Sequence, residues 1–212
     1  MERILIVGAG GFGREVFCYV KDQQKQQGKE AKIFFLDDNL DSLKGHLLQD
    51  LHLGRIDDFS PTEQDHFIIA IGDPTVRLKI TERLEKKKAK FATIVHPTAY
   101  VAESTALQPG TIVGPFAFIG PDCLIGKHVM FNTYASCGHD AVIGDYCVLS
   151  PYAVVNGNVT LGQLVFMGTQ ACVVLGRKVG EKSKIGAGAL VLKDVPERSL
   201  AVGSPAHSEQ KY

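Results

Sequence analysis

A six-residue repeat of apolar positions fills the C-terminal half of the chain. Between the first and last repeat positions, every sixth residue is apolar without exception. The repeat positions are Val95, Val101, Leu107, Val113, Ile119, Ile125, Phe131, Cys137, Ile143, Leu149, Val155, Leu161, Met167, Val173, Val179, Ile185 and Val191. Neither the helical period of about 3.6 residues nor the strand period of about 2 residues explains this spacing, so the pattern indicates a chain that turns a corner every six residues.

Two further columns accompany the apolar one. Glycine often follows the apolar residue, at positions 114, 120, 126, 138, 144, 162, 168, 180 and 186. The fourth residue after the apolar one is small or β-branched nearly everywhere, and Arg177 is the only large exception. We expect each leg to be a short strand with a large side chain inward, a small one near the corner, and glycine where the backbone takes a positive φ. Three legs close a triangular coil, so residues 95–196 predict about five to six stacked coils.

Residues 1 to about 90 alternate between short apolar runs and helical patterns. The expected strands are 3–7, 33–36 and 67–71, and the expected helices run from the glycine turn 8–13 to about residue 27 and from Pro74 or Thr75 to about residue 88. This alternation predicts a three-stranded parallel sheet, a βαβαβ unit that is half of a Rossmann-like fold, with its ligand beyond the carboxyl ends of the strands. We therefore expect two domains, residues 1–92 and 93–212.

The glycine turn matches a nucleotide-binding pattern. Gly8, Gly10 and Gly13 have the dinucleotide spacing, and acidic residues follow about 25 positions later. Three strands are too few for a dinucleotide fold, however, whereas backbone N–H groups at a helix N-terminus favour a phosphate and a carboxylate can bind ribose hydroxyls. The pattern therefore favours one nucleoside diphosphate over NAD, with a purely structural turn as the remaining alternative.

Charge and cysteine content exclude several other classes of function. Lys plus Arg and Asp plus Glu both number 23, so no net field recruits nucleic acid or an anionic membrane. The five cysteines lack metal or redox spacing, and several fall on inward columns as small core residues. Met1 leads directly into a strand, and no apolar run approaches the ~20 residues needed to cross a bilayer. We expect a cytoplasmic protein.

The repeat resembles that of the hexapeptide-repeat acyltransferases, whose coils form a left-handed parallel β-helix. With the glycine turn, the segment His-Pro-Thr-Ala at 96–99 and the closing Gly-Ser-Pro-Ala at 203–206, the resemblance covers nearly the whole chain. It is to the acetyltransferases of bacterial surface-sugar synthesis, both the N-acetyltransferases of nucleotide-linked 4-amino sugars and their sialic acid O-acetyltransferase relatives. It implies a homotrimer that uses acetyl-CoA and no metal, with the nucleotide sugar on the N-terminal domain and acetyl-CoA between neighbouring β-helices.

The resemblance also implies roles for particular residues. An ammonium has no lone pair, so acetyl transfer to an amine needs a base, and imidazole is the natural one near pH 7. His139 takes that role, Asp140 pairs with it, and Asn132 orients the base or the substrate. The N–H of Gly157 meets the oxyanion of the tetrahedral intermediate. The implied nucleotide-sugar contacts are Gly10, Gly11, Phe12, Asp37, Asp38 and Gly72, and the implied acetyl-CoA contacts are Gly157, Thr169 and Ala187.

The chain departs from close relatives at two positions. Relatives carry a second histidine where this chain has Tyr146, Cys147 and Val148, and their glycine turn often has histidine in place of Phe12. The predicted function is acetyl-CoA-dependent N-acetylation of a nucleotide-linked amino sugar, such as a UDP-4-amino-4,6-dideoxy sugar, for surface glycans. A sialic acid O-acetyltransferase and a non-catalytic scaffold or nucleotide-sugar sensor are the alternatives. The sequence leaves the nucleotide and the acetylated ring position open.

Overall fold

The N-terminal part of the chain forms a four-stranded parallel sheet with a helix on each face. The computed structural model describes residues 2–210, and the sheet has the strand order β2-β1-β3-β4. Its elements are β1 (Arg3–Val7), α1 (Gly11–Gln27), β2 (Lys32–Leu36), a short 3-10 helix (Gln49–Leu51), β3 (Asp65–Ile69), α2 (Pro74–Lys86) and β4 (Lys90–Phe91). The three predicted strands and two predicted helices are present, and β3 begins and ends two residues before its predicted range of 67–71. The strand β4 was not predicted because two residues are too few to show a period.

Alternation along the strands divides the apolar residues between the two helices. Ile6, Phe35 and Ile68 pack with α1, whereas Leu5 and Phe67 lie on the other face in the cluster that contains Ile80 and Leu84 of α2. Successive side chains of a strand point to opposite faces, so each helix covers its own set. The sheet is therefore buried on both sides, and its carboxyl edge is left for the glycine turn.

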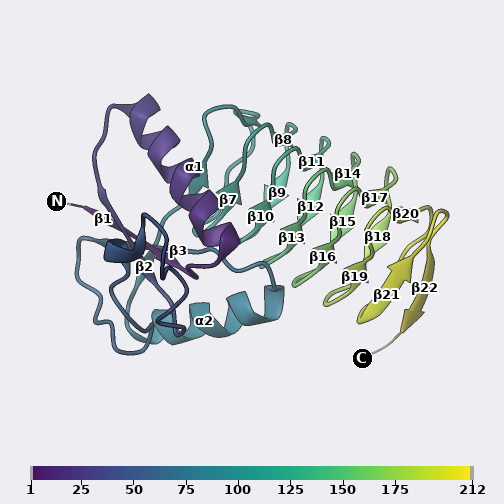
Figure 1. The fold of residues 1–212 in the computed structure, drawn as a ribbon. Helices are drawn as coiled ribbons and strands as arrows, with labels where there is room; N and C mark the ends of the chain where they lie inside the picture. Colours follow the sequence, from purple (N-terminus) through teal and green to yellow (C-terminus); the bar gives the residue numbers. More distant parts are fainter. Residues whose placement is uncertain (1, 211–212) are drawn as a thin grey trace.

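The rest of the chain is a triangular solenoid with three parallel sheets along its faces (Figure 1). The first sheet contains β5 (Ile94–Val95), β7 (Ile112–Val113), β10 (Met130–Phe131), β13 (Val148–Leu149), β16 (Phe166–Met167), β19 (Lys184–Ile185), β21 (Ser199–Val202) and β22 (His207–Gln210). The second contains β6 (Tyr100–Val101), β8 (Phe118–Ile119), β11 (Ser136–Cys137), β14 (Val154–Val155), β17 (Cys172–Val173) and β20 (Leu190–Val191). The third contains β9 (Leu124–Ile125), β12 (Val142–Ile143), β15 (Thr160–Leu161) and β18 (Lys178–Val179).

The predicted inward columns form the solenoid core. Every apolar repeat position from 113 to 191 is at most 3% exposed, and the small column that includes Ala135 and Ala153 is buried beside it. Strands of successive coils pair in register with an offset of 18 residues, as Phe131 with Leu149. Three six-residue legs therefore make one coil, as the repeat predicted. The antiparallel hairpin of β21 and β22 closes the far end and was not predicted.

The glycines of the repeat do not take the positive φ that was predicted for them, so that prediction was wrong. Positive φ falls two positions after the glycines, on residues such as Phe116, Asp140 and Tyr146 with φ of 58°, 58° and 61°. The glycines are needed because the next coil lies close to them: a Cβ added at Gly144 would come within 2.7 Å of the backbone nitrogen of Gln163. Close stacking of coils, and not a left-handed backbone, selects glycine at this position.

The N-terminal domain packs across the outer face of the first sheet. Outward side chains of that sheet, including Met130 and Val148, share a buried cluster with α1. On the α2 side, the fully buried Arg77 donates to the carbonyl oxygens of Ile69, at 2.7 Å, and of His128. Apolar and polar contacts thus hold the N-terminal sheet and its helices against the first coils of the solenoid. The hairpin of β21 and β22 lies at the opposite end of the solenoid (Figure 1).

Candidate functional site

His139 and Asp140 form an exposed pair at one corner of the solenoid. The second corner, as we call it, follows the strands of the second sheet at 138–141, 156–159 and 174–177. Nδ1 of His139 lies 2.7 Å from Oδ2 of Asp140, and both side chains are about half exposed. Because a carboxylate only accepts, Nδ1 carries the proton and Nε2 keeps its lone pair. The predicted pair is therefore in contact, with a basic nitrogen available to solvent.

Gly157 lies directly beside that basic nitrogen, on the next coil. A Cβ at position 157 would come within 2.6 Å of Nε2 of His139, so only glycine leaves room for the imidazole. The carbonyl of Gly157 accepts from Gly176, whereas its N–H has no backbone acceptor in the described part of the chain. The corner thus places the imidazole against a buried glycine whose N–H has no backbone acceptor among residues 2–210.

Asn132 lies at a different corner from His139. The first corner, as we call it, follows the strands of the first sheet at 132–135, 150–153, 168–171 and 186–189. The side-chain oxygen of Asn132 accepts from the N–H of Thr133 at 2.7 Å. Among residues 2–210, no interaction joins Asn132 to His139 or Asp140. The structure of one chain therefore keeps these predicted catalytic residues on separate corners.

Thr169 and Ala187 share the first corner with Asn132. Both are exposed and lie on adjacent coils, since a Cβ at Gly168 would come within 2.6 Å of the nitrogen of Ala187. Two of the three predicted acetyl-CoA contacts thus lie together, whereas Gly157 lies on the second corner with His139.

The glycine turn contains glycines of two kinds. Gly8 has φ +99°, and a Cβ at Gly13 would come within 1.9 Å of the oxygen of Gly8, so these two glycines allow the strand and helix to approach. Gly10 and Gly11 have no atom within 4 Å of an added Cβ, and their backbone opens α1 with free N–H groups toward solvent. Phe12 is half-buried against the α1 cluster. The open glycines are therefore the ones that a ligand can approach.

The acidic residues at the end of β2 are already hydrogen-bonded. Oδ2 of Asp37 accepts from the N–H of Ala9 at 2.7 Å and Oδ1 accepts from the N–H of Asn39, which ties the glycine turn to β2. Asp38 accepts from the N–H of Ile56 and lies 3.4 Å from Arg83. Both carboxylates therefore stabilise the loops at the carboxyl edge of the sheet.

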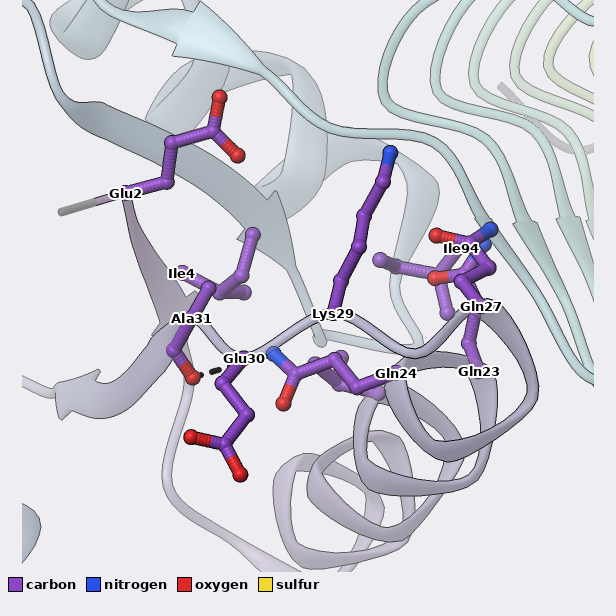
Figure 2. A pocket seen from close by; sticks show the side chains of 10 residues that line it. Glu2, Ile4, Gln23, Gln24, Gln27, Lys29, Glu30, Ala31 and Ile94 are labelled. Atoms are coloured by element: carbon purple, nitrogen blue, oxygen red, sulfur yellow. Dashed lines mark hydrogen bonds between the residues drawn. The ribbon is translucent and has the colours of Figure 1, made fainter.

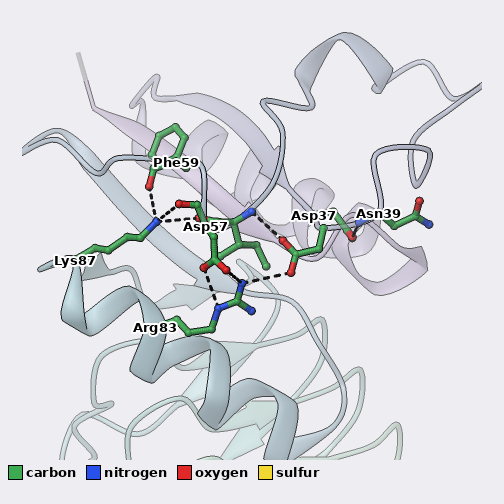
Figure 3. A network of polar contacts seen from close by, with 8 residues as sticks. Asp37, Asn39, Asp57, Phe59, Arg83 and Lys87 are labelled. Atoms are coloured by element: carbon green, nitrogen blue, oxygen red, sulfur yellow. Dashed lines mark hydrogen bonds and ion pairs between the residues drawn. The ribbon is translucent and has the colours of Figure 1, made fainter.

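The network in Figure 3 holds the loop that follows β2 against α2. Arg83 pairs with both carboxylate oxygens of Asp57, at 3.0 and 2.7 Å, and Lys87 donates to the carbonyl oxygens of Asp57 and Phe59. Gly72, the remaining predicted substrate contact, is exposed at the end of β3 beside Asp73, which caps α2. The structure thus brings the predicted nucleotide contacts to one edge of the sheet.

Sequence reasoning missed the contact between α1 and the first corner. The hydroxyl of Tyr19 lies 3.4 Å from Oγ1 of Thr133 and 3.2 Å from Oε2 of Glu15. Tyr19 belongs to the helical pattern of α1 and Thr133 to a corner, so no local signal in the sequence joins them.

A hollow beside α1 lies away from these residues. Figure 2 shows it at the C-terminal end of the helix, lined by residues such as Gln24, Lys29 and Ile94. None of the predicted site residues lines it, so the hollow is not the predicted nucleotide site. Between residues 2 and 210 no group of three His, Cys, Asp or Glu side chains is placed to hold a metal. Both described helices are too short or too polar to cross a membrane.

Comparisons with known proteins identify the fold over its whole length. Residues 3–84 match the family model of the PglD N-terminal domain. The chain is similar to the acetyltransferase domain of PglB from Neisseria gonorrhoeae FA1090 in complex with acetyl coenzyme A, with 29% identity, a TM-score of 0.88, and coverage of 98% of this chain and 99% of that one. It is also similar to a mutant of perosamine N-acetyltransferase from Caulobacter crescentus in complex with CoA and GDP-perosamine, with 25% identity, a TM-score of 0.87, and coverage of 100% and 98%.

Curated relatives match over a shorter segment. The galactoside O-acetyltransferase of Lactococcus lactis is 40% identical over 47 residues, which are 22% of this chain and 23% of that protein. The chain thus matches about a quarter of the length of these relatives. The structural matches show that the solenoid is the predicted left-handed β-helix of an acetyltransferase fold. The chain is thus similar over its whole length to hexapeptide-repeat sugar acetyltransferases, and its N-terminal part matches the PglD N-terminal domain.

Proposed function

We propose that the protein is an acetyl-CoA-dependent N-acetyltransferase of a nucleotide-linked amino sugar, with His139 as the general base. The observation that carries this proposal is the geometry of the second corner. A histidine held by Asp140 places Nε2 against Gly157, whose N–H has no backbone acceptor among the described residues. A proton acceptor and an oxyanion donor in this arrangement are what acyl transfer from a thioester to an amine requires.

The reaction then proceeds by direct transfer. The sugar amine attacks the thioester carbonyl carbon while Nε2 of His139 takes a proton from the nitrogen, and the N–H of Gly157 donates to the oxyanion. Collapse of the tetrahedral intermediate breaks the C–S bond, and the imidazolium returns the proton to the departing CoA thiolate. Asp140 holds the ring in the tautomer that leaves Nε2 unprotonated. No acyl-enzyme is needed, and Cys137 is fully buried.

The complete site needs two chains in this proposal. Asn132, Thr169 and Ala187 lie on the first corner and His139 on the second, so one chain alone separates them. In a homotrimer, the first corner of one chain would meet the second corner of its neighbour, with acetyl-CoA between them. Stacked aromatic rings on the first corner and on the coil before it, Phe116 with Tyr134 and Tyr134 with Tyr152, are 42–52% exposed and supply apolar surface for such a contact.

Residues 1–92 would bind the nucleotide part of the acceptor, and residues 93–212 would bind acetyl-CoA. Gly10 and Gly11 leave open backbone at the start of α1, where a diphosphate is favoured, and Gly72 is exposed at the same edge. Asp37, Asp38 and the half-buried Phe12 complete the proposed contacts. A structural neighbour named as a perosamine N-acetyltransferase was solved with GDP-perosamine, which supports an amino sugar as the acceptor.

O-acetylation of sialic acid or a related sugar is the second candidate, because the same base can activate a hydroxyl. The match to a galactoside O-acetyltransferase supports it, but over a short segment. The UDP-4-amino-4,6-dideoxy sugar, the role in surface glycans and the cytoplasmic location stay predictions.

Release of CoA, followed with a thiol reagent, tests the proposal. The acceptors are UDP-, GDP- and dTDP-linked amino sugars and free and CMP-linked sialic acid. We expect turnover with one nucleotide-linked amino sugar, and a loss of about 10²-fold or more in His139→Ala. Asp140→Asn should also lose activity, whereas the exposed loop variant His46→Ala should keep it. Turnover on sialic acid alone would support the O-acetyltransferase, and no turnover with any acceptor would contradict an enzymatic role.

A further inference from the structure

A chain of three side chains runs from the first turns of α1 to the first corner of the solenoid. Glu15, Tyr19 and Thr133 are joined by contacts of 3.2 and 3.4 Å. Thr133 in turn donates its backbone N–H to Asn132. These hydrogen bonds therefore link α1, the helix that begins at the glycine turn, to the corner that holds Asn132, a proposed catalytic residue.

The direction of these hydrogen bonds follows from their chemistry. A carboxylate only accepts, so the Tyr19 hydroxyl donates to Glu15, and the Thr133 hydroxyl donates to the oxygen of Tyr19. Tyr19 is 6% exposed and packs edge-on against His96, with ring centroids 5.7 Å apart. Burial raises the pKa of Tyr19, so the phenol remains a donor. The buried tyrosine thus fixes one oxygen of an otherwise exposed carboxylate.

The second oxygen of Glu15 is available to a ligand. Glu15 is exposed, and within residues 2–210 its carboxylate has Tyr19 as its only hydrogen-bond partner. It stands about one helical turn beyond Gly11, where the proposed site receives a diphosphate. It is also two hydrogen bonds from Thr133. Glu15 therefore lies on the helix that joins the proposed diphosphate site to the first corner.

A purely structural role for Glu15 does not account for its second, unpaired carboxylate oxygen. The pair Glu15 and Tyr19 has the i,i+4 spacing of a helix-stabilising contact, which contributes only about 0.2–0.5 kcal/mol. Without Glu15 the buried Tyr19 hydroxyl could donate to Oγ1 of Thr133 instead, because either oxygen of that pair can be the donor. A carboxylate fixed at one oxygen and free at the other is suited to bind a donor group.

We propose that Glu15 binds the sugar ring of the nucleotide-linked acceptor, by accepting a hydrogen bond from a hydroxyl or amino group. This inference rests on the proposed function. In it Glu15 determines which sugar is bound, Tyr19 positions Glu15, and neither takes part in proton transfer. The diphosphate and nucleoside parts are bound independently of Glu15.

Binding calorimetry with two ligands tests this role. One ligand is the nucleotide sugar on which the wild type is active, and the other is the corresponding free nucleoside diphosphate. Glu15→Gln should raise Kd for the nucleotide sugar about 10- to 100-fold, as expected for a hydrogen bond to a charged group, and leave Kd for the diphosphate unchanged. Tyr19→Phe should show a smaller effect in the same direction. Glu30→Gln, an equal charge change at the far end of the same domain, should change neither value.

Two results would overturn the inference. Unchanged affinity of Glu15→Gln for the nucleotide sugar, in a wild type that binds and acetylates it, would remove Glu15 from the site and leave the proposed function intact. Equal losses for both ligands, with an unchanged unfolding temperature, would show that Glu15 supports the nucleotide-binding turn instead. A wild type that neither binds nor acetylates any nucleotide sugar would overturn the proposed function and the inference together.

Discussion

The pair of His139 and Asp140 depends on the conformation of a single corner residue. Asp140 has φ 58°, in the left-handed region that aspartate and asparagine tolerate better than most residues. This conformation is that of the same position in neighbouring coils, so the solenoid itself turns the carboxylate toward the preceding histidine. Gly157 then leaves room for the ring on the other side. The repeat thus supplies the geometry, and only the side chains are specific to this corner.

His128 makes stability depend on pH. Burial and the nearby charges of Arg77 and Lys127 lower the pKa of His128 to about 3, from an ordinary value of 6.5. The ring is 1% exposed, and it stacks on Tyr146 and contacts Phe91 edge-on. The unfolded chain therefore binds a proton between about pH 6.5 and pH 3 that the folded chain does not. This stabilisation is complete above about pH 6.5 and is lost as the pH falls toward 3.

We expect the free energy of unfolding of the wild type to fall with pH more steeply than that of His128→Asn. The difference in slope between pH 6 and 4 should be about 1.4 kcal/mol per pH unit, the value for one proton. Asparagine tolerates the left-handed conformation at this position but does not titrate. Urea unfolding at several pH values measures both slopes, and equal slopes would contradict the buried, neutral state of His128.

At the scale of the elements, the coils are spaced by the glycine column. Gly144→Ala would place a Cβ 2.7 Å from backbone atoms of residues 162 and 163 on the next coil, so the backbone of one of the two coils must shift. We expect a loss of about 2–4 kcal/mol, or a fall in unfolding temperature of roughly 5–15 °C. Gly10→Ala is the control, because nothing lies within 4 Å of its added Cβ. Gly10→Ala should unfold at the same temperature as the wild type. An unchanged unfolding temperature for Gly144→Ala would contradict the role of close stacking between coils.

The six-residue period predicted the inward column, the coil of three legs and the parallel sheets, because one large side chain per leg must fill a narrow interior. The same period places Asn132 and His139 on successive corners, because the two residues are seven positions apart and each leg has six residues. The glycine column was predicted for the wrong reason, because a period shows where glycine recurs but not what approaches it. Neither the contact of Arg77 with His128 nor that of Tyr19 with Thr133 was predictable, since each joins segments far apart in the sequence.

At the scale of the whole molecule, the fold divides the proposed site between two corners of each chain. The N-terminal domain and α1 lie beside the first corner, so the acceptor and Asn132 belong to one side of the proposed site. His139 and Gly157 belong to the other side, which a neighbouring chain would supply. Exposed stacked rings of Tyr100 and Phe118 lie on the second sheet, between the two corners, and add apolar surface for a contact between chains.

Mixed oligomers of two inactive variants test whether acetyl transfer takes place between the corners of two chains. The variants are His139→Ala and Asn132→Ala, co-expressed with different tags and purified as mixed oligomers. A contact between the first corner of a His139→Ala chain and the second corner of an Asn132→Ala chain contains only native site residues. Random assembly in a cyclic oligomer makes about a quarter of the contacts of this kind. We therefore predict CoA release at about a quarter of the wild-type rate, far above either variant alone. Mixed oligomers no more active than the separate variants would show that the active site is not shared between two chains.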